Sequence, residues 1–282
     1  MRLDARWVVA LLWCAMGLFA SGSASGAAGE PSGELIARSQ ITTTGEPSCT
    51  LVQAPLAKDK LDALSEMLRQ DIADGRIPGA GLAIHQAGKR VYTFAAGRVG
   101  HNRDGAVGRH TRFRLFSMTK PLISVAVLQL VEAGRLKLSD PLTRYLPVFS
   151  NIRLEGPGGT WLPASGPITI RDLLRHTSGL PYGFFGRGRV REILKAAELY
   201  RGGRTAEETM VVLVKAGLEH SPGSVWEYGH SNTVLAAVLE AIHQKPLADV
   251  LHASLFAPLA MTSTSFFVPT AVPDDVVAGT PN

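Results

Sequence analysis

Cysteine is nearly absent from this 282-residue sequence, which contains only Cys14 and Cys49. Cys14 lies in an apolar N-terminal run, and removal of that run would leave Cys49 without an intramolecular partner. A disulfide-stapled scaffold is therefore excluded, and stability must come from a hydrophobic core. There is no Cys-x-x-Cys pair, and the eight histidines lack zinc-ligand spacing. We therefore predict no metal site and no organic cofactor.

The motifs of several other enzyme classes are missing too. No Gly-x-Ser-x-Gly occurs, which disfavours an α/β-hydrolase triad. Neither a His-Glu-x-x-His helix nor a Gly-x-x-x-x-Gly-Lys loop is present. The net charge is a modest +5, and the densest basic stretch, residues 187–204, is interpreted as a solvated loop and helix. We therefore predict no nucleic-acid partner.

Long hydrophobic runs are also scarce. The longest, residues 7–20, is too short to span a bilayer comfortably. Arg2 and Arg6 precede it and small residues follow it, which is the layout of a secretory signal. We predict a cleaved signal peptide over residues 1–26, a flexible leader over 27–57, and one domain over 58–282. The mature protein is then expected to be periplasmic or secreted, without stable membrane insertion.

Apolar residues make up 45% of the chain, enough for a packed globular core. Apolar spacing predicts a helix over residues 58–73, followed by strands over 79–84 and 90–96 joined by a Gly-containing hairpin. A helix over 120–133 is apolar on nearly every face and should be central to a core. Further helices are predicted over residues 168–175 (capped by Thr169), 206–216, 231–244 and 247–256. The fold class is therefore α+β.

Ser117 and Lys120 stand at the start of the most apolar predicted helix. Their three-residue spacing places them on one helical face, within reach of each other. Burial of this helix start would favour the neutral, basic form of lysine, and a helix N-terminus offers free N–H groups to an anion. We predict that Ser117 is a nucleophile and Lys120 its partner. The alternative is a capping serine beside a snorkelling lysine.

Three blocks of sequence carry a resemblance to a known family. They are residues 113–121 around Ser117, residues 132–141, and residues 170–180, which end in His-Thr-Ser-Gly-Leu. Together they resemble serine β-lactamases and penicillin-binding proteins, in particular the class C β-lactamase-like group with family VIII carboxylesterases, D-aminopeptidases and 6-aminohexanoate-dimer hydrolases. The resemblance implies a β-lactamase/transpeptidase-like fold, an antiparallel sheet flanked by helices with an all-helical part.

The resemblance also implies a second catalytic residue, Tyr228, because residues 222–228 match the approach to the tyrosine of this group. A phenol needs a nearby cation such as Lys120 to act as a base. The alternative is a core tyrosine. His230 occupies the place of an asparagine in the β-lactamase motif, and Asn232 lies two residues too far along. We assign His230 a substrate-binding role; the alternative is an incidental surface histidine. His176 could serve as a serine-activating base, but the resemblance makes it part of a turn.

The third element of this group, a Lys-Thr-Gly-like triad on a strand, has no candidate after Tyr228. We therefore expect an incomplete sheet and a missing C-terminal portion. The leading hypothesis is an exported serine hydrolase that forms an acyl-enzyme on Ser117 and acts on small esters or amides. The alternatives are β-lactamase or D-Ala-peptidase activity and, in another class, an inactive remnant or binding protein. The sequence leaves the oligomeric state open.

Overall fold

The computed structural model describes residues 56–100, 103–199 and 203–266. They fall into two compact units, which divide after Thr111, and each unit is described by itself. The predicted signal peptide and nearly all of the predicted leader lie outside the described residues. Among the helices that are described, none has both the length and the apolar character that a membrane span requires.

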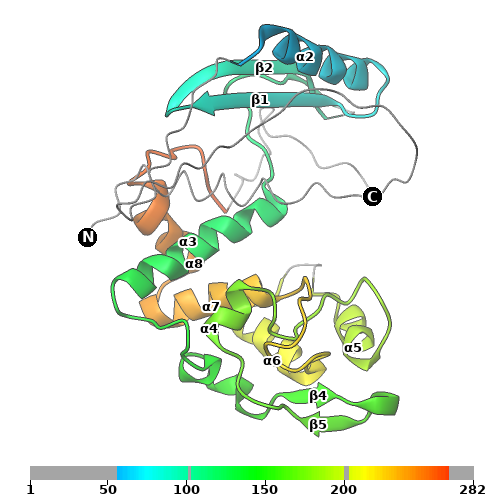
Figure 1. Cartoon of the computed structure of the whole chain (residues 1–282), viewed down its shortest axis with the longest axis vertical. Coiled ribbons are helices and arrows are strands. Elements are labelled where there is room, and N and C mark those ends of the chain that lie inside the picture. The colour runs from blue at the N-terminus through cyan, green and yellow to red at the C-terminus, as the bar shows by residue number, and fades with distance from the viewer. Residues whose placement is uncertain (1–55, 101–102, 200–202, 267–282) are drawn as a thin grey trace, which may run out of the picture. The chain divides into compact units, whose positions relative to one another are not determined.

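The first unit is a helix on a small antiparallel sheet. It comprises α2 (Lys58–Ala73), β1 (Gly79–Gln86), β2 (Lys89–Gly100) and β3 (Arg103–Ala106), with strand order β1-β2-β3 (Figure 1). Ala87 and Gly88 form the two-residue turn between β1 and β2, and both have positive φ angles. A two-residue hairpin of this twist requires that conformation, which glycine adopts without strain. The predicted helix and hairpin are confirmed.

One face of this sheet packs against α2. Leu82 pairs with Phe94 across the strands, and these partly buried residues alternate with exposed ones along β1 and β2. A hydrogen bond between Ser65 and Tyr92, and the guanidinium of Arg69 over the Phe94 ring, join α2 to this face. The sequence did not predict β3, because four residues without apolar alternation carry no strand signal.

The second unit is mainly helical. Its helices are α3 (Thr119–Glu132), α4 (Ile170–Leu174), α5 (Arg189–Ala197), α6 (Ala206–Ala216), α7 (Ser231–His243) and α8 (Leu247–Leu251). Short helical turns cover Phe116–Met118, Leu142–Arg144, Pro147–Asn151, Pro157–Gly159 and His252–Phe256. Thr169 and Thr205 each form a capping box at the start of α4 and α6. The predicted cap at Thr169 is confirmed, although the helix covers residues 170–174 and not 168–175, and the predicted bounds of 206–216 are confirmed.

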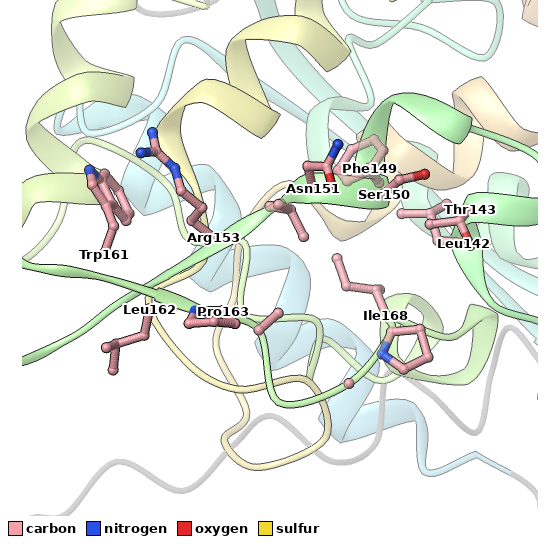
Figure 2. Close-up of a pocket in the computed structure, with 14 residues that line it drawn as sticks. Leu142, Thr143, Phe149, Ser150, Asn151, Arg153, Trp161, Leu162, Pro163 and Ile168 are labelled. Carbon is pink, nitrogen blue, oxygen red and sulfur yellow. The ribbon is translucent and has the colours of Figure 1, made fainter.

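A second hairpin, β4 (Arg153–Glu155) and β5 (Trp161–Pro163), escaped prediction because each strand has only three residues. The Trp161 ring lies near two guanidinium groups, those of Arg153 and Arg189, at 4.7 and 4.8 Å from its centroid. Beside this hairpin is a pocket of ≈ 760 Å³ (Figure 2). Its lining runs from Leu142 to Ile168 and includes none of the predicted site residues.

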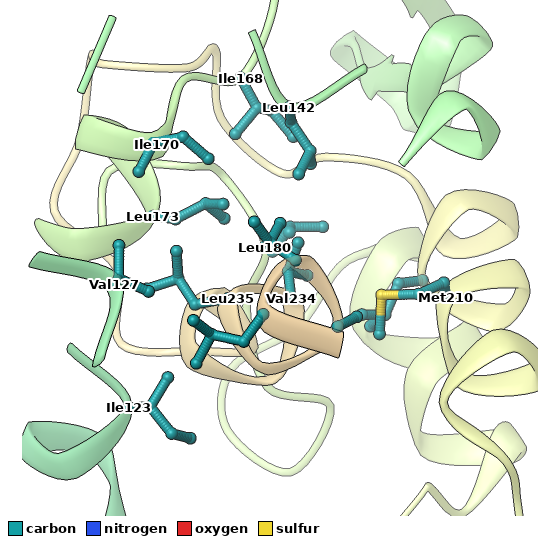
Figure 3. Close-up of a cluster of buried hydrophobic side chains, with 14 of the residues drawn as sticks. Ile123, Val127, Leu142, Ile168, Ile170, Leu173, Leu180, Met210, Val234 and Leu235 are labelled. Atoms are coloured by element: carbon teal, nitrogen blue, oxygen red, sulfur yellow. The ribbon is translucent and has the colours of Figure 1, made fainter. Parts of the chain in front are cut away.

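The core of the second unit is built around α7. Val234, Leu235, Val238 and Leu239 are fully buried, and α3, α4, α6 and α8 pack around them (Figure 3). Helix α3 buries one face, whereas Leu128 is 43% exposed. The predicted place of this helix in a core is confirmed for the face that packs against α7 and α8, whereas Leu128 lies on a face that is not buried. Helices with small antiparallel sheets confirm the α+β class.

Candidate active site

Ser117 lies in the single helical turn Phe116–Met118, which continues directly into α3. Phe116 has a φ angle of 44°, a left-handed conformation that non-glycine residues rarely adopt. Such strain is often found next to reactive residues. Ser117 is exposed and Lys120 half-buried, so the predicted burial of this helix start is not observed.

Lys120 and Ser117 are in direct contact. The Lys120 Nζ donates a hydrogen bond to Ser117 Oγ at 3.0 Å. The predicted placement on one face is confirmed, because an i, i+3 spacing brings side chains together in either kind of helical turn.

The backbone around Ser117 differs from the expectation of free N–H groups. The Met118 N–H donates to the carbonyl of Leu115 at 2.8 Å, and the Thr119 N–H bonds the carbonyls of Phe116 and Ser117. A tight turn before the helix satisfies these donors internally. At these two positions, the prediction of free donors for an anion is wrong.

Tyr228 completes the predicted group of three. Its hydroxyl donates to Ser117 Oγ at 2.8 Å, and the Lys120 Nζ lies 4.8 Å from its ring centroid. Burial raises the pKa of Tyr228, but hydrogen bonds with Lys120 and Ser117 and the positive charge of Lys120 outweigh it, so the pKa is lower than usual. The structure thus brings together a hydroxyl, an ammonium and an acidified phenol. Their catalytic roles stay predictions.

The segment before α7 reaches Ser117 through contacts with a distant part of the chain. The Glu227 N–H donates to the carbonyl of His176 at 2.8 Å, and the His230 N–H donates to that of Leu180 at 3.0 Å. Between them, a Cβ on Gly229 would lie 1.9 Å from the Leu180 carbonyl oxygen. Only glycine permits this approach, which sets where Tyr228 enters the site.

His230 is buried, with 3% of its surface exposed, so the alternative of an incidental surface histidine is wrong. Its ring lies edge-on to Tyr182, with ring centroids 4.7 Å apart. Burial, together with the positive charge of Lys120, lowers the pKa of His230 to about 4. The imidazole is therefore neutral at neutral pH. Its substrate-binding role remains a prediction.

His176 contacts the tyrosine of the site. Its ring centroid lies 5.0 Å from that of Tyr228, and its φ angle of 56° places it in a left-handed turn. Burial and then the charge of Lys120 lower the pKa of His176, while a hydrogen bond with Asn232 acts in the opposite direction. Ser117 receives its hydrogen bonds from Lys120 and Tyr228. This geometry agrees with the turn interpretation of His176.

Asn232 is a site neighbour that the sequence did not reveal. Its Nδ2 lies 3.4 Å from both the carbonyl oxygen of Lys120 and the Oγ of Ser124. By comparison with the β-lactamase motif, it lies two residues too far along the sequence. Because α7 begins at Ser231, Asn232 is in its first turn and faces α3. The signal available in the sequence was a polar residue, asparagine, at the start of the apolar helix predicted over residues 231–244.

Arg191 is a second residue whose role the sequence missed, since the basic stretch was interpreted as solvated. It is 8% exposed and forms ion pairs with Glu219 and Glu227. These two carboxylates and His220 lie close enough to share a metal ion. The guanidinium already bonds both carboxylates, so the cluster has its cation.

Comparison with known proteins decides the family. Residues 64–281 match the family model of the Beta-lactamase family, which covers well over half of the chain. The chain belongs to the Beta-lactamase family. It is 33% identical over 224 residues to esterase EstB of Burkholderia gladioli, a match that covers 78% of this chain and 54% of EstB.

Solved structures of similar proteins share the fold. EstCE1, described as a hydrolase with promiscuous acyltransferase activity, matches with a TM-score of 0.69 and 30% identity, over 78% of this chain and 56% of EstCE1. Simvastatin synthase (LovD) from Aspergillus terreus matches with a TM-score of 0.61 and 26% identity, over 72% of this chain and 54% of LovD. The β-lactamase/transpeptidase-like fold and the esterase-like resemblance are confirmed. The chain spans about half the length of the curated relatives it matches.

Proposed function

We propose that this chain is an exported serine hydrolase that forms an acyl-enzyme on Ser117 and acts on small esters or amides. The observation that carries this is the pair of hydrogen bonds on Ser117 Oγ, from Lys120 at 3.0 Å and Tyr228 at 2.8 Å. Covalent catalysis requires a nucleophile with groups in hydrogen-bond reach that accept its proton once they have lost their own. The esterase and acyltransferase descriptions of EstB and EstCE1 support the same chemistry.

This geometry supports the following proton transfers. Once Tyr228 or Lys120 has lost its own proton, it accepts the hydroxyl proton of Ser117 while Oγ attacks the substrate carbonyl carbon. The bond to the leaving group then breaks, and the same proton passes to the departing oxygen or nitrogen. Water repeats the sequence on the acyl-enzyme, releasing the acid and restoring the Ser117 hydroxyl. The lowered pKa of Tyr228 makes its phenolate available closer to neutral pH.

The substrate preference rests on His230. It takes the place of an asparagine in the β-lactamase motif, and it is buried and uncharged at neutral pH. An imidazole offers one donor and one acceptor where an amide offers more. We therefore place esters and small amides ahead of β-lactams and D-Ala peptides.

Labelling of the purified chain tests the nucleophile. With a fluorophosphonate probe and digestion, the peptide that contains Ser117 should carry the label, and Ser117→Ala should lower p-nitrophenyl butyrate hydrolysis at least about 10³-fold. Ser150→Ala removes another exposed serine and is the matched control, with activity unchanged. A label on a different serine contradicts the assignment. A folded chain with neither label nor hydrolysis favours a binding protein on this fold.

Export is proposed from the N-terminal sequence alone. The charged start, the apolar run over residues 7–20 and the small residues after it support cleavage between residues 24 and 28. Expression of the full chain in a bacterial host, followed by mass measurement of the periplasmic or secreted fraction, tests this. A cytoplasmic product that retains residue 1 would reject it.

A further inference from the structure

The guanidinium of Arg191 in α5 is a buried hub with five hydrogen bonds. Nε and Nη2 donate to the carboxylate of Glu219 at 2.9 and 2.6 Å, and Nη2 also donates to Glu227 at 2.9 Å. Nη1 donates to the carbonyls of Tyr182 and Phe185 at 3.2 and 2.6 Å. Only the planar fork of arginine can bond a carboxylate in bidentate fashion while serving other acceptors.

This hub joins two segments that border the candidate site. Glu227 immediately precedes Tyr228. Its side chain accepts a hydrogen bond from Arg191, and its N–H donates to the His176 carbonyl. On the other side, Arg191 fixes the main chain of Tyr182, whose ring meets Tyr228 edge-on at 5.4 Å between centroids. The backbone before Tyr228 and the Tyr182 ring that packs against it therefore both depend on the guanidinium of Arg191.

The hydrogen bonds of Arg191 are largely shielded from water. Arg191 is 8% exposed, and its two carboxylate partners are partly buried. Charge-assisted hydrogen bonds are shorter and stronger than neutral ones, and a low local dielectric strengthens them further. A surface ion pair would fix little. Only one of the two carboxylates is adjacent in sequence to the tyrosine of the site. Glu227 is the neighbour of Tyr228, whereas Glu219 lies nine residues before it.

We propose that Arg191, acting through Glu227, is a positioning residue that holds the Tyr228 hydroxyl on Ser117; this rests on the proposed function of that pair. Arg191 touches no reacting atom in this scheme. Its effect is on where the phenol sits.

Two substitutions that remove one carboxylate each from the same guanidinium test this. Glu227→Ala should lower kcat for p-nitrophenyl butyrate about 10-fold to 100-fold with KM little changed, because a small displacement of a catalytic group is costly. Glu219→Ala is the matched control: it breaks the bidentate pair and should destabilise the fold more, yet reduce kcat less. Glu227→Gln keeps an acceptor oxygen for Arg191 and should restore most of the rate. If the loss of rate instead follows the loss of stability in urea unfolding, positioning is rejected.

A second measurement does not depend on hydrolysis. The chain labelled with [ζ-¹³C]tyrosine, with the Tyr228 signal assigned through Tyr228→Phe, reports the pKa of Tyr228 by NMR titration. Removing the negative charge of Glu227 would by itself lower this pKa. Movement of the phenol away from Lys120 would raise it, and we expect a rise in Glu227→Ala. A fall or no change overturns the positioning role. If Ser117 is never labelled by the probe, the proposed function fails, while the direction of this shift still decides the role of Arg191.

Discussion

The two segments that meet at Ser117 are held in place by different means. The first, with Ser117 and Lys120, is local: a three-residue spacing in a helical turn and α3 brings the two side chains to 3.0 Å. The second, with Tyr228, belongs to no helix or strand, and its position depends on contacts with His176, Leu180 and Arg191. The first segment can form from its own sequence, whereas the second requires the folded second unit.

Because of this difference, substitutions in the two segments should impair catalysis in different ways. Substitutions in the Ser117 segment remove a reacting group while the backbone stays in place. Substitutions around Tyr228 move a group that is still present, because its position is the sum of several long-range contacts. Asn232 is one link between the segments, since it lies four residues after Tyr228 and its side chain bonds the Lys120 carbonyl.

The largest effect is expected when the two segments lose their direct contact. Tyr228→Phe keeps the ring, with its packing on His176, and removes only the hydroxyl that bonds Ser117 at 2.8 Å. We expect kcat to fall about 10²–10⁴-fold, the usual contribution of a proton-transfer group, with an unchanged unfolding midpoint. Hydrolysis of p-nitrophenyl esters and urea unfolding measure both. A loss of less than threefold would show that Lys120 alone handles the proton.

Gly229→Ala tests the geometry of the Tyr228 segment without touching any reacting group. The new Cβ would lie 1.9 Å from the Leu180 carbonyl oxygen, so the two backbones must separate. We expect a stability loss of about 1–3 kcal/mol and a rate loss together, since strain of this kind cannot relax in place. The control is Gly166→Ala, which has open space around its Cβ. Equal behaviour of the two variants in urea unfolding would contradict the close approach.

The same division explains how much the sequence could reveal. Helices α2 and α6 and the β1–β2 hairpin were predicted closely, because apolar spacing, capping residues and turn glycines are local signals. The Ser117–Lys120 contact followed from helical spacing for the same reason. Tyr228 came from resemblance, since no local pattern links it to a serine 111 residues earlier.

Arg191 and Asn232 show what local patterns cannot carry. A stretch rich in arginine looks solvated until its acidic partners, 28 and 36 residues away, are known to fold onto it. Asn232 was misjudged for a related reason, because its importance depends on α7 packing against α3. The short hairpin β4–β5 was missed because three residues give no periodicity.

An effect on pH-dependent stability, with no reacting group removed, is expected at His230, where the Tyr228 segment enters α7. Burial and the charge of Lys120 lower its pKa to about 4, against 6.5 when unfolded. Between these values the unfolded chain binds a proton that the folded chain does not, so stability falls as the pH decreases from 6.5 toward 4. This group should contribute a loss of roughly 2 kcal/mol between pH 7.5 and 5.0. Urea unfolding of wild type and His230→Gln at both pH values measures it. The variant should lose that much less stability on acidification, and an equal loss in both proteins would place the titrating group elsewhere.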